Sequence, residues 1–202
     1  MREYRTPNPT GVLIIILINV LVFVATQLSG DLEYQLALQP AYFTEEPWTV
    51  LTSTFVHANI WHIIGNMLTL YFFGSYLTKM VGETKFLITY FAGGLAGSAF
   101  FMLYALYAPW ESASAQYVSV VGASGAVFAV GGALAVLSPN VKVLVYGIIP
   151  VPMWGAVLGS FLLTAIIPGV AWEAHLGGLV LGLIAGLLFI RRPSRPRDRY
   201  LL

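Results

Sequence analysis

The chain contains no cysteine and few charged side chains. Without thiols it forms no disulfide, has no thiolate nucleophile and offers zinc no cysteine ligand. Only 9% of its 202 residues are Asp, Glu, Lys or Arg, whereas a soluble domain carries about 25%. The formal net charge of +1 also lacks the basic excess that attracts nucleic acid, so we expect no nucleic-acid partner.

Apolar residues take the place of the missing charges and make up 58% of the chain. A soluble core of this size cannot enclose so much apolar surface, so the composition predicts an integral, multi-pass protein of the lipid bilayer. Six apolar runs approach the roughly 20 residues with which a helix spans a bilayer. These runs cover residues 11–28, 56–78, 86–107, 118–137, 143–167 and 174–190.

The six runs predict an all-α bundle of six transmembrane helices that forms one domain over residues 1–202. The segment 29–55 is too polar to span and is expected to be an external loop, and residues 191–202 form a basic tail. Pro150 and Pro152 are expected to kink the fifth helix. A kinked fifth helix that gates substrate entry is a further hypothesis.

Lys and Arg occur only at alternate ends of these runs, which predicts an orientation. The cations lie in both tails and after the second and fourth runs. The other connections, about residues 29–55, 108–117 and 168–173, contain acidic residues but no Lys or Arg. By the positive-inside rule both termini lie in the cytoplasm, and we expect a prokaryotic cell membrane.

Polar side chains interrupt three runs close to their expected outer ends. Ser124 is expected about seven residues into the fourth run, and His175 near the start of the sixth. His57 and His62 occupy the first part of the second run. Ionisable residues inside a membrane face the bundle interior or a water-filled cavity. The three runs are therefore expected to bring polar groups into one layer.

Helical spacing places small residues on the same faces as Ser124 and His175. The face of Ser124 also holds Phe128, Gly131 and Ala135, and that of His175 holds Gly178, Gly182 and Gly186. Small residues let helices approach closely, so the two faces could pack together. A serine and a histidine in contact are the minimum for an activated nucleophile. The alternative is that Ser124 is only a small packing residue.

The histidines allow other interpretations, because each could simply hydrogen-bond a neighbour or all three could bind zinc. His57 and His62 are five residues apart and would point about 140° apart on a helix, unlike typical ligand pairs. His62 and Asn66 share a face and suit stabilisation of a developing oxyanion. No carboxylate lies within the runs, so we expect a dyad without metal, with Phe128 stacked on His175.

Three segments together resemble the rhomboid intramembrane serine proteases with the minimal six-span core. They are HANIWHIIGNM at 57–67, GASGAVF at 122–128 and AHLGGLVLG at 174–182, within a similarity from about Trp48 to Gly186. The resemblance implies Ser124 as nucleophile, His175 as general base, and an oxyanion hole of His62, Asn66 and the Ser124 backbone N–H. It further implies an aromatic Phe128 against His175 and no cofactor or metal.

By this resemblance the expected activity is that of a serine endopeptidase. It would cleave transmembrane segments of other membrane proteins near the outer face. A catalytically silent rhomboid-like protein that binds transmembrane helices is the alternative, and a small transporter is a third possibility. A transporter is expected to show inverted repeats or charges deep in the bilayer, and the sequence has neither.

Overall fold

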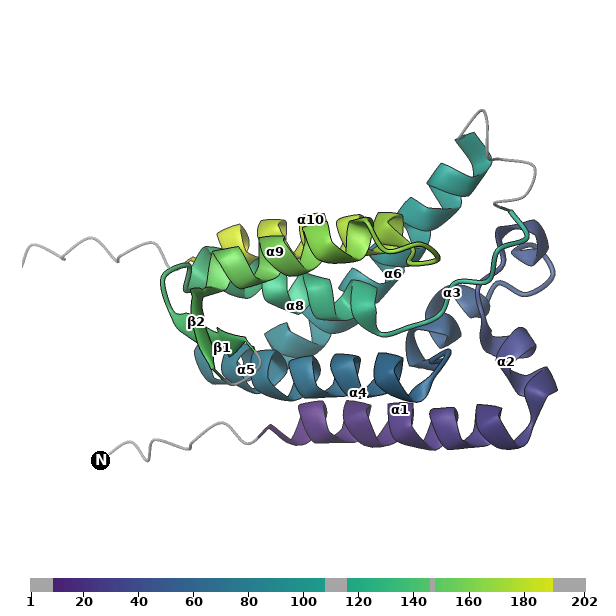
Figure 1. Cartoon of the computed structure of the whole chain (residues 1–202), viewed down its shortest axis with the longest axis horizontal. Helices are drawn as coiled ribbons and strands as arrows, with labels where there is room; N and C mark the ends of the chain where they lie inside the picture. The colour runs from purple at the N-terminus through teal and green to yellow at the C-terminus, as the bar shows by residue number, and fades with distance from the viewer. Residues whose placement is uncertain (1–8, 108–115, 146–147, 191–202) are drawn as a thin grey trace, which may run out of the picture.

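The computed structural model describes residues 9–107, 116–145 and 148–190. Figure 1 shows mainly helices that run side by side along one direction. The long helices are α1 (Thr10–Leu28), α6 (Glu83–Tyr107) and α10 (Trp172–Phe189), and these are long and apolar enough to cross a membrane. Helices α8 (Ser124–Leu137) and α9 (Met153–Ala165) are apolar but shorter.

The second apolar run forms a continuous helical segment whose hydrogen bonding changes midway. Helix α4 (Ile60–Thr69) leads into a π-helical turn (Leu70–Gly74) and then into α5 (Ser75–Val81). At 1.5 Å per residue this segment is roughly 30 Å long, which matches the hydrocarbon thickness of a bilayer. The side chain of Asn59 accepts the His62 N–H at 2.9 Å and caps the first turn.

The segment 29–55 folds into short helices at the end of the bundle where α4 and α8 begin (Figure 1). These are α2 (Gly30–Leu36), α3 (Thr49–Thr52) and two 3₁₀ turns, Pro40–Tyr42 and Ser53–Phe55. The Ser98 hydroxyl of α6 donates to the Val50 carbonyl at 2.9 Å. The segment is therefore tied to the bundle and, as expected, does not span it.

The fourth apolar run becomes helical later than expected. Residues 118–123 are not helical, and Val120 exchanges two backbone hydrogen bonds with Leu38, at 2.8 and 3.1 Å. Gly122 has a φ of +128°, which no helix accommodates. The β-branched residues before Gly122 also favour an extended chain. Ser124 is therefore the first residue of α8, and its expected place seven residues into a helix is wrong.

The fifth run is also only partly helical, because its first half forms a hairpin. Strand β1 (Lys142–Val145) pairs antiparallel with β2 (Ile149–Pro152), and α9 starts after it. The expected kink at Pro150 and Pro152 is wrong, since both lie in β2, opposite Leu144 and Lys142. Alternate residues of a two-stranded ladder direct their N–H groups outward, which is where proline is tolerated.

Helices α8 and α10 are in direct backbone contact. A Cβ added to Gly178 would collide with the Gly125 carbonyl oxygen, and one on Gly182 with that of Ala129. The glycine face of α10 thus packs on α8, as predicted. The contacting face of α8 is shifted by one residue from the predicted one, so that Ser124 lies beside the contact.

Helix α6 also packs closely against α8 and α10 through glycines. Gly93 lies against the Ala129 methyl group, and a Cβ on Gly97 would come within 2.8 Å of the Ala174 carbonyl oxygen. Aromatic and aliphatic side chains fill the remaining core, among them the fully buried Phe86, Tyr90 and Leu134. These contacts give α8 a buried position between α6 and α10.

Substitution of Gly178 by alanine is expected to lower the stability of the protein. Because the added methyl meets backbone rather than a mobile side chain, the helices must separate, and overpacking of this kind costs about 1–3 kcal/mol or more. Gly159→Ala is the matched control, since a Cβ there meets nothing within 4 Å and alanine favours the helix by about 0.5–1 kcal/mol. Thermal unfolding in detergent measures both, and equal melting temperatures would contradict the packing contact.

Candidate functional site

Helices α4, α8 and α10 start at the same end of the bundle (Figure 1). Each carries a polar residue in its first turn. Ser124 begins α8, His175 lies in the first turn of α10, and His62 lies in the first turn of α4. The predicted common layer is therefore present. It is made by helix N-termini rather than by residues deep within the helices.

The hydroxyl of Ser124 and the imidazole of His175 are in hydrogen-bond contact. Their Oγ and Nε2 atoms are 2.8 Å apart. The His175 side chain is only 5% exposed, and the Phe128 ring lies against it with centroids 4.6 Å apart and planes inclined at 33°. The contact between Ser124 and His175 and the stacking of Phe128 on His175, both expected from the sequence, are therefore present.

Thr164, in the last turn of α9, has a place in the site that the sequence analysis missed. Its Oγ1 atom is 3.1 Å from Nδ1 of His175, so the second ring nitrogen of the imidazole has a partner. The available signal was a polar residue in an apolar run. Nothing in the sequence tells which face of α9 turns inward, so the residue did not stand out.

A small hollow next to Ser124 is bounded by Gly122 and His62. A Cβ added to Gly122 would be 2.8 Å from Nε2 and Cε1 of His62 and 3.5 Å from Ser124 Oγ. The absence of a side chain at Gly122 therefore lets the His62 ring lie beside Ser124, where both residues line the open groove. The Ser124 N–H is among the first of α8, where N–H groups have no intrahelical acceptor and the helix dipole favours negative charge.

Asn66 lies one turn after His62 and lines the same space. Its Nδ2 group donates one hydrogen bond to the His62 carbonyl, at 3.0 Å. An amide Nδ2 carries two hydrogens, so one remains for a further acceptor. Hydrogen-bond donors from α4 and α8 therefore border one hollow beside the serine hydroxyl.

His57 does not lie where the sequence analysis put it. It precedes α4, so the angle of about 140° derived for a helix does not apply and the prediction that it points away from His62 is wrong. The two rings meet edge to face with centroids 5.0 Å apart. His57 is fully buried, and its Nε2 accepts the Ala123 N–H at 3.5 Å. It thus supports both His62 and the start of α8.

The three histidines do not converge on one point. In the described parts of the chain, no three His, Asp or Glu side chains come together as metal ligands. Glu173 is buried in the first turn of α10, but the partner of the His175 Nδ1 atom is Thr164. The polar groups at this end therefore form a serine–histidine pair, with the hydrogen-bond donors of His62 and Asn66 beside it.

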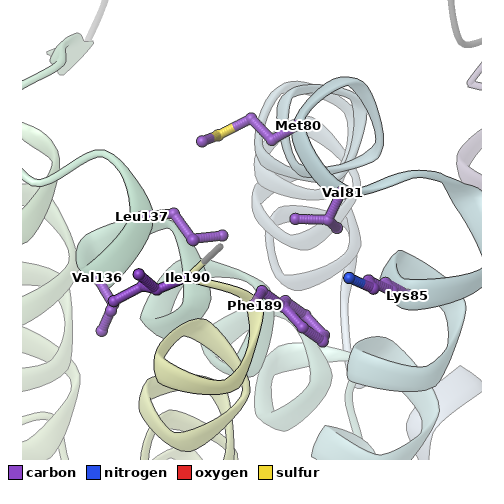
Figure 2. Close-up of a pocket in the computed structure, with 7 residues that line it drawn as sticks. All are labelled: Met80, Val81, Lys85, Val136, Leu137, Phe189 and Ile190. Atoms are coloured by element: carbon purple, nitrogen blue, oxygen red, sulfur yellow. The ribbon is translucent and has the colours of Figure 1, made fainter. Parts of the chain in front are cut away.

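A groove of about 1710 Å³ contains the pair and extends between α4 and α9 toward β1. Its lining includes Ser124 and His175 at one end and the apolar Phe72, Met153 and Leu144 further along. A second cavity, of about 450 Å³, is shown in Figure 2. Its lining among the described residues is apolar apart from Lys85, whose Nζ lies 4.9 Å from the centroid of the Phe189 ring, and includes no serine, histidine or carboxylate. The first groove is the candidate active site.

The family model for the Rhomboid domain matches residues 44–192, which include all the site residues above. The chain belongs to the rhomboid family. Rhomboid protein 1, mitochondrial, of Saccharomyces cerevisiae is 34% identical over 194 residues, which cover 91% of this chain and 54% of that protein. RHOMBOID-like protein 12, mitochondrial, of Arabidopsis thaliana is 35% identical over 152 residues, 68% of this chain and 45% of that protein.

Other relatives show that family membership alone does not settle activity. Inactive RHOMBOID-like protein 8 of Arabidopsis thaliana is 31% identical over 97 residues, 47% of this chain and 28% of that protein. The chain spans about half the length, or less, of these curated relatives. Two of them are named as mitochondrial, which weighs against the expected prokaryotic membrane, and that location stays a prediction.

Gly122→Ala is expected to reduce catalytic turnover on the order of 10²-fold while the protein still folds, because the methyl group would push the His62 ring away from the hollow that an oxyanion would occupy. The left-handed φ of Gly122 adds backbone strain, so the control must share it. Gly82→Ala does so, with a φ of +90° and nothing within 4 Å of its Cβ. Turnover per folded molecule is measured for both, and an equal loss would exclude a role for the hollow.

Proposed function

We propose that this protein is an intramembrane serine endopeptidase that cleaves transmembrane segments of other membrane proteins. The observation that carries the proposal is the 2.8 Å contact between Ser124 Oγ and His175 Nε2 in a groove open between helices. A nucleophile paired with a base is what acyl transfer to serine requires. Membership in the rhomboid family supports the same conclusion.

Cleavage begins when Ser124 Oγ attacks the carbonyl carbon of the scissile peptide bond and His175 Nε2 takes the hydroxyl proton. The carbonyl oxygen becomes an oxyanion in the hollow beside Gly122. There it accepts hydrogen bonds from the Ser124 N–H, His62 and the second Nδ2 hydrogen of Asn66. Donors aimed at the charge that develops in the transition state lower the barrier more than they strengthen substrate binding.

The intermediate then collapses with loss of the C–N bond, and His175 gives its proton to the leaving amine. The carbonyl carbon stays bound to Ser124 Oγ as an ester. Water enters, His175 takes one of its protons, and the hydroxide attacks the ester carbon. When this second intermediate collapses, the bond between the ester carbon and Ser124 Oγ breaks, His175 returns the proton to Oγ, and the carboxylic acid product leaves. No metal or cofactor takes part in this cycle.

The membrane arrangement that we propose has six spans, with α4 and α5 joined as the second. Both ends of the described chain lie at the same end of the bundle in Figure 1, which fits an even number of crossings. The charge distribution then orients both termini toward the cytoplasm and the site toward the outer face. Substrate segments are proposed to enter the groove from the lipid between α4 and α9.

A catalytically silent protein that binds transmembrane helices is the second candidate. The observation in its favour is the relative named inactive. The paired serine and histidine favour the protease, since a pure binding role does not need their contact. Labelling by a fluorophosphonate probe separates the two, because only an activated serine reacts.

Ser124→Ala and His175→Ala are each expected to abolish cleavage of a model transmembrane substrate in liposomes. The double variant is expected to be no worse than either, since hydroxyl and imidazole act as one unit. Chelator is expected to leave activity of the unaltered protein intact. Probe labelling of the purified variants serves as the second measurement, and clear turnover by Ser124→Ala would overturn the proposed nucleophile.

The proposed orientation is tested with single cysteines, for which the cysteine-free chain is well suited. Ser29→Cys, after α1, is expected to react with an impermeant maleimide in intact cells, and Asn140→Cys, before β1, only after lysis. Both positions are exposed in the structure. The reverse pattern would invert the orientation, and labelling of both in intact cells would contradict six spans.

A further inference from the structure

Thr164 connects α9 to the serine–histidine pair, and its hydroxyl makes two contacts. The Oγ1 atom is 3.0 Å from the Phe161 carbonyl oxygen on its own helix and 3.1 Å from His175 Nδ1. Back-bonding to a carbonyl one turn earlier is a common arrangement for threonine in a helix. The second contact is the one that concerns catalysis.

The number of hydrogens decides the direction of both bonds. A threonine hydroxyl has one hydrogen, and a carbonyl oxygen only accepts. Both contacts are satisfied together only if the hydroxyl donates to the Phe161 carbonyl and accepts a hydrogen from His175 Nδ1. In that arrangement the neutral imidazole carries its single hydrogen on Nδ1.

The tautomer determines whether the histidine can act as a base. With the hydrogen on Nδ1, the lone pair of Nε2 faces Ser124 Oγ at 2.8 Å and accepts the hydroxyl proton. In the other tautomer Nε2–H would donate to the serine oxygen, and Nε2 would have no lone pair with which to take a proton. Only the first tautomer activates the nucleophile.

We propose that Thr164 is a positioning residue that holds His175 in the Nδ1–H tautomer and so keeps it a base toward Ser124. This inference rests on the proposed protease function and adds to it a residue from a third helix. A neutral hydroxyl thereby takes the orienting place that a carboxylate fills in serine–histidine–aspartate sites.

The same contact makes the imidazole sensitive to the position of α9. Phe161 of α9 meets Phe128 edge to face at 6.1 Å, and Phe128 stacks on His175. The buried side chains of α9, Met153 and Val157, both lie in its first half, away from Thr164. If the end of α9 that carries Thr164 moves outward, the His175 imidazole loses its hydrogen-bond acceptor. Phe128, which stacks on the imidazole, then also loses its contact with the Phe161 ring. His175 is therefore held in the basic tautomer only while α9 is packed against it.

Thr164→Val tests this role because it removes the hydroxyl and keeps the branched shape. We expect kcat to fall about tenfold, the size expected for one lost hydrogen bond, with KM within about twofold of the original. Thr164→Ser retains the hydroxyl and is expected to restore most of the activity. Thr89→Val is the matched control: Thr89 likewise back-bonds to its helix, at 2.8 Å to the Lys85 carbonyl oxygen, but it is fully buried and is not part of the groove lining.

Nitrogen-15 NMR of labelled histidine, on the full chain in detergent, reports the tautomer without any need for turnover. The His175 signals, assigned by their absence in His175→Gln, are expected to show Nδ1–H in the unaltered protein and in Thr164→Ser. In Thr164→Val they are expected to shift toward the Nε2–H form. A dominant Nε2–H form in the unaltered protein overturns the proposal, as does an unchanged kcat in Thr164→Val.

These two measurements also separate this inference from the proposed function. If the unaltered protein neither cleaves substrates nor reacts with the probe while its His175 carries Nδ1–H, the protease proposal fails and the tautomer assignment stands. If it cleaves with equal kcat in the presence and absence of the Thr164 hydroxyl, the protease proposal stands and the positioning role fails.

Discussion

The backbone contact between α8 and α10 sets the distance on which the candidate site depends. A serine hydroxyl and an imidazole extend only a short way from their own helices, so a bond of 2.8 Å between them requires the two backbones to lie close. Gly178 and Gly182 face carbonyl oxygens of α8 without any side chain between. Without an apolar driving force between helices in lipid, such close packing is also what holds a membrane bundle together. The same glycines therefore serve stability and the geometry of the site.

The start of α8 is the second element that shapes the site. An extended segment, tied to Leu38 and to Ser53 by backbone bonds, turns at Gly122 and enters the helix with the serine as its first residue. The nucleophile elbow of soluble α/β-hydrolases likewise places its serine on a sharp turn from strand to helix. In both cases the turn exposes the hydroxyl and places an N–H at a helix start beside it, where in this protein the proposed oxyanion would form. The likeness is one of local geometry, since the surrounding folds differ.

The helices that form the site differ greatly in how much of their surface is buried in the bundle. Helix α8 is packed between α6 and α10, and nine of its residues are buried, so the helices that carry Ser124 and His175 are anchored in the core. Helix α9 has two buried residues and borders the groove on its other side. Regions with little buried contact open at lower free-energy cost than the core. The proposed protease activity needs such a division, because the chemistry requires fixed groups and a transmembrane substrate requires an entrance from the lipid.

Much of this protein follows from its sequence alone, namely a helical membrane protein, a serine and a histidine on small-residue faces, and the rhomboid family. Composition and local spacing decide the first two, because apolar length and helical period act within one segment. The family follows from the resemblance carried by the three motifs on residues 57–67, 122–128 and 174–182. The sequence did not determine where α8 and α9 begin, since pairing of Val120 with Leu38 and of β1 with β2 overrides the apolar pattern there. It also gave no sign of the contact between Thr164 and His175, or of His57 against His62. Those contacts join residues of separate segments, and only the packing of helices determines which faces meet.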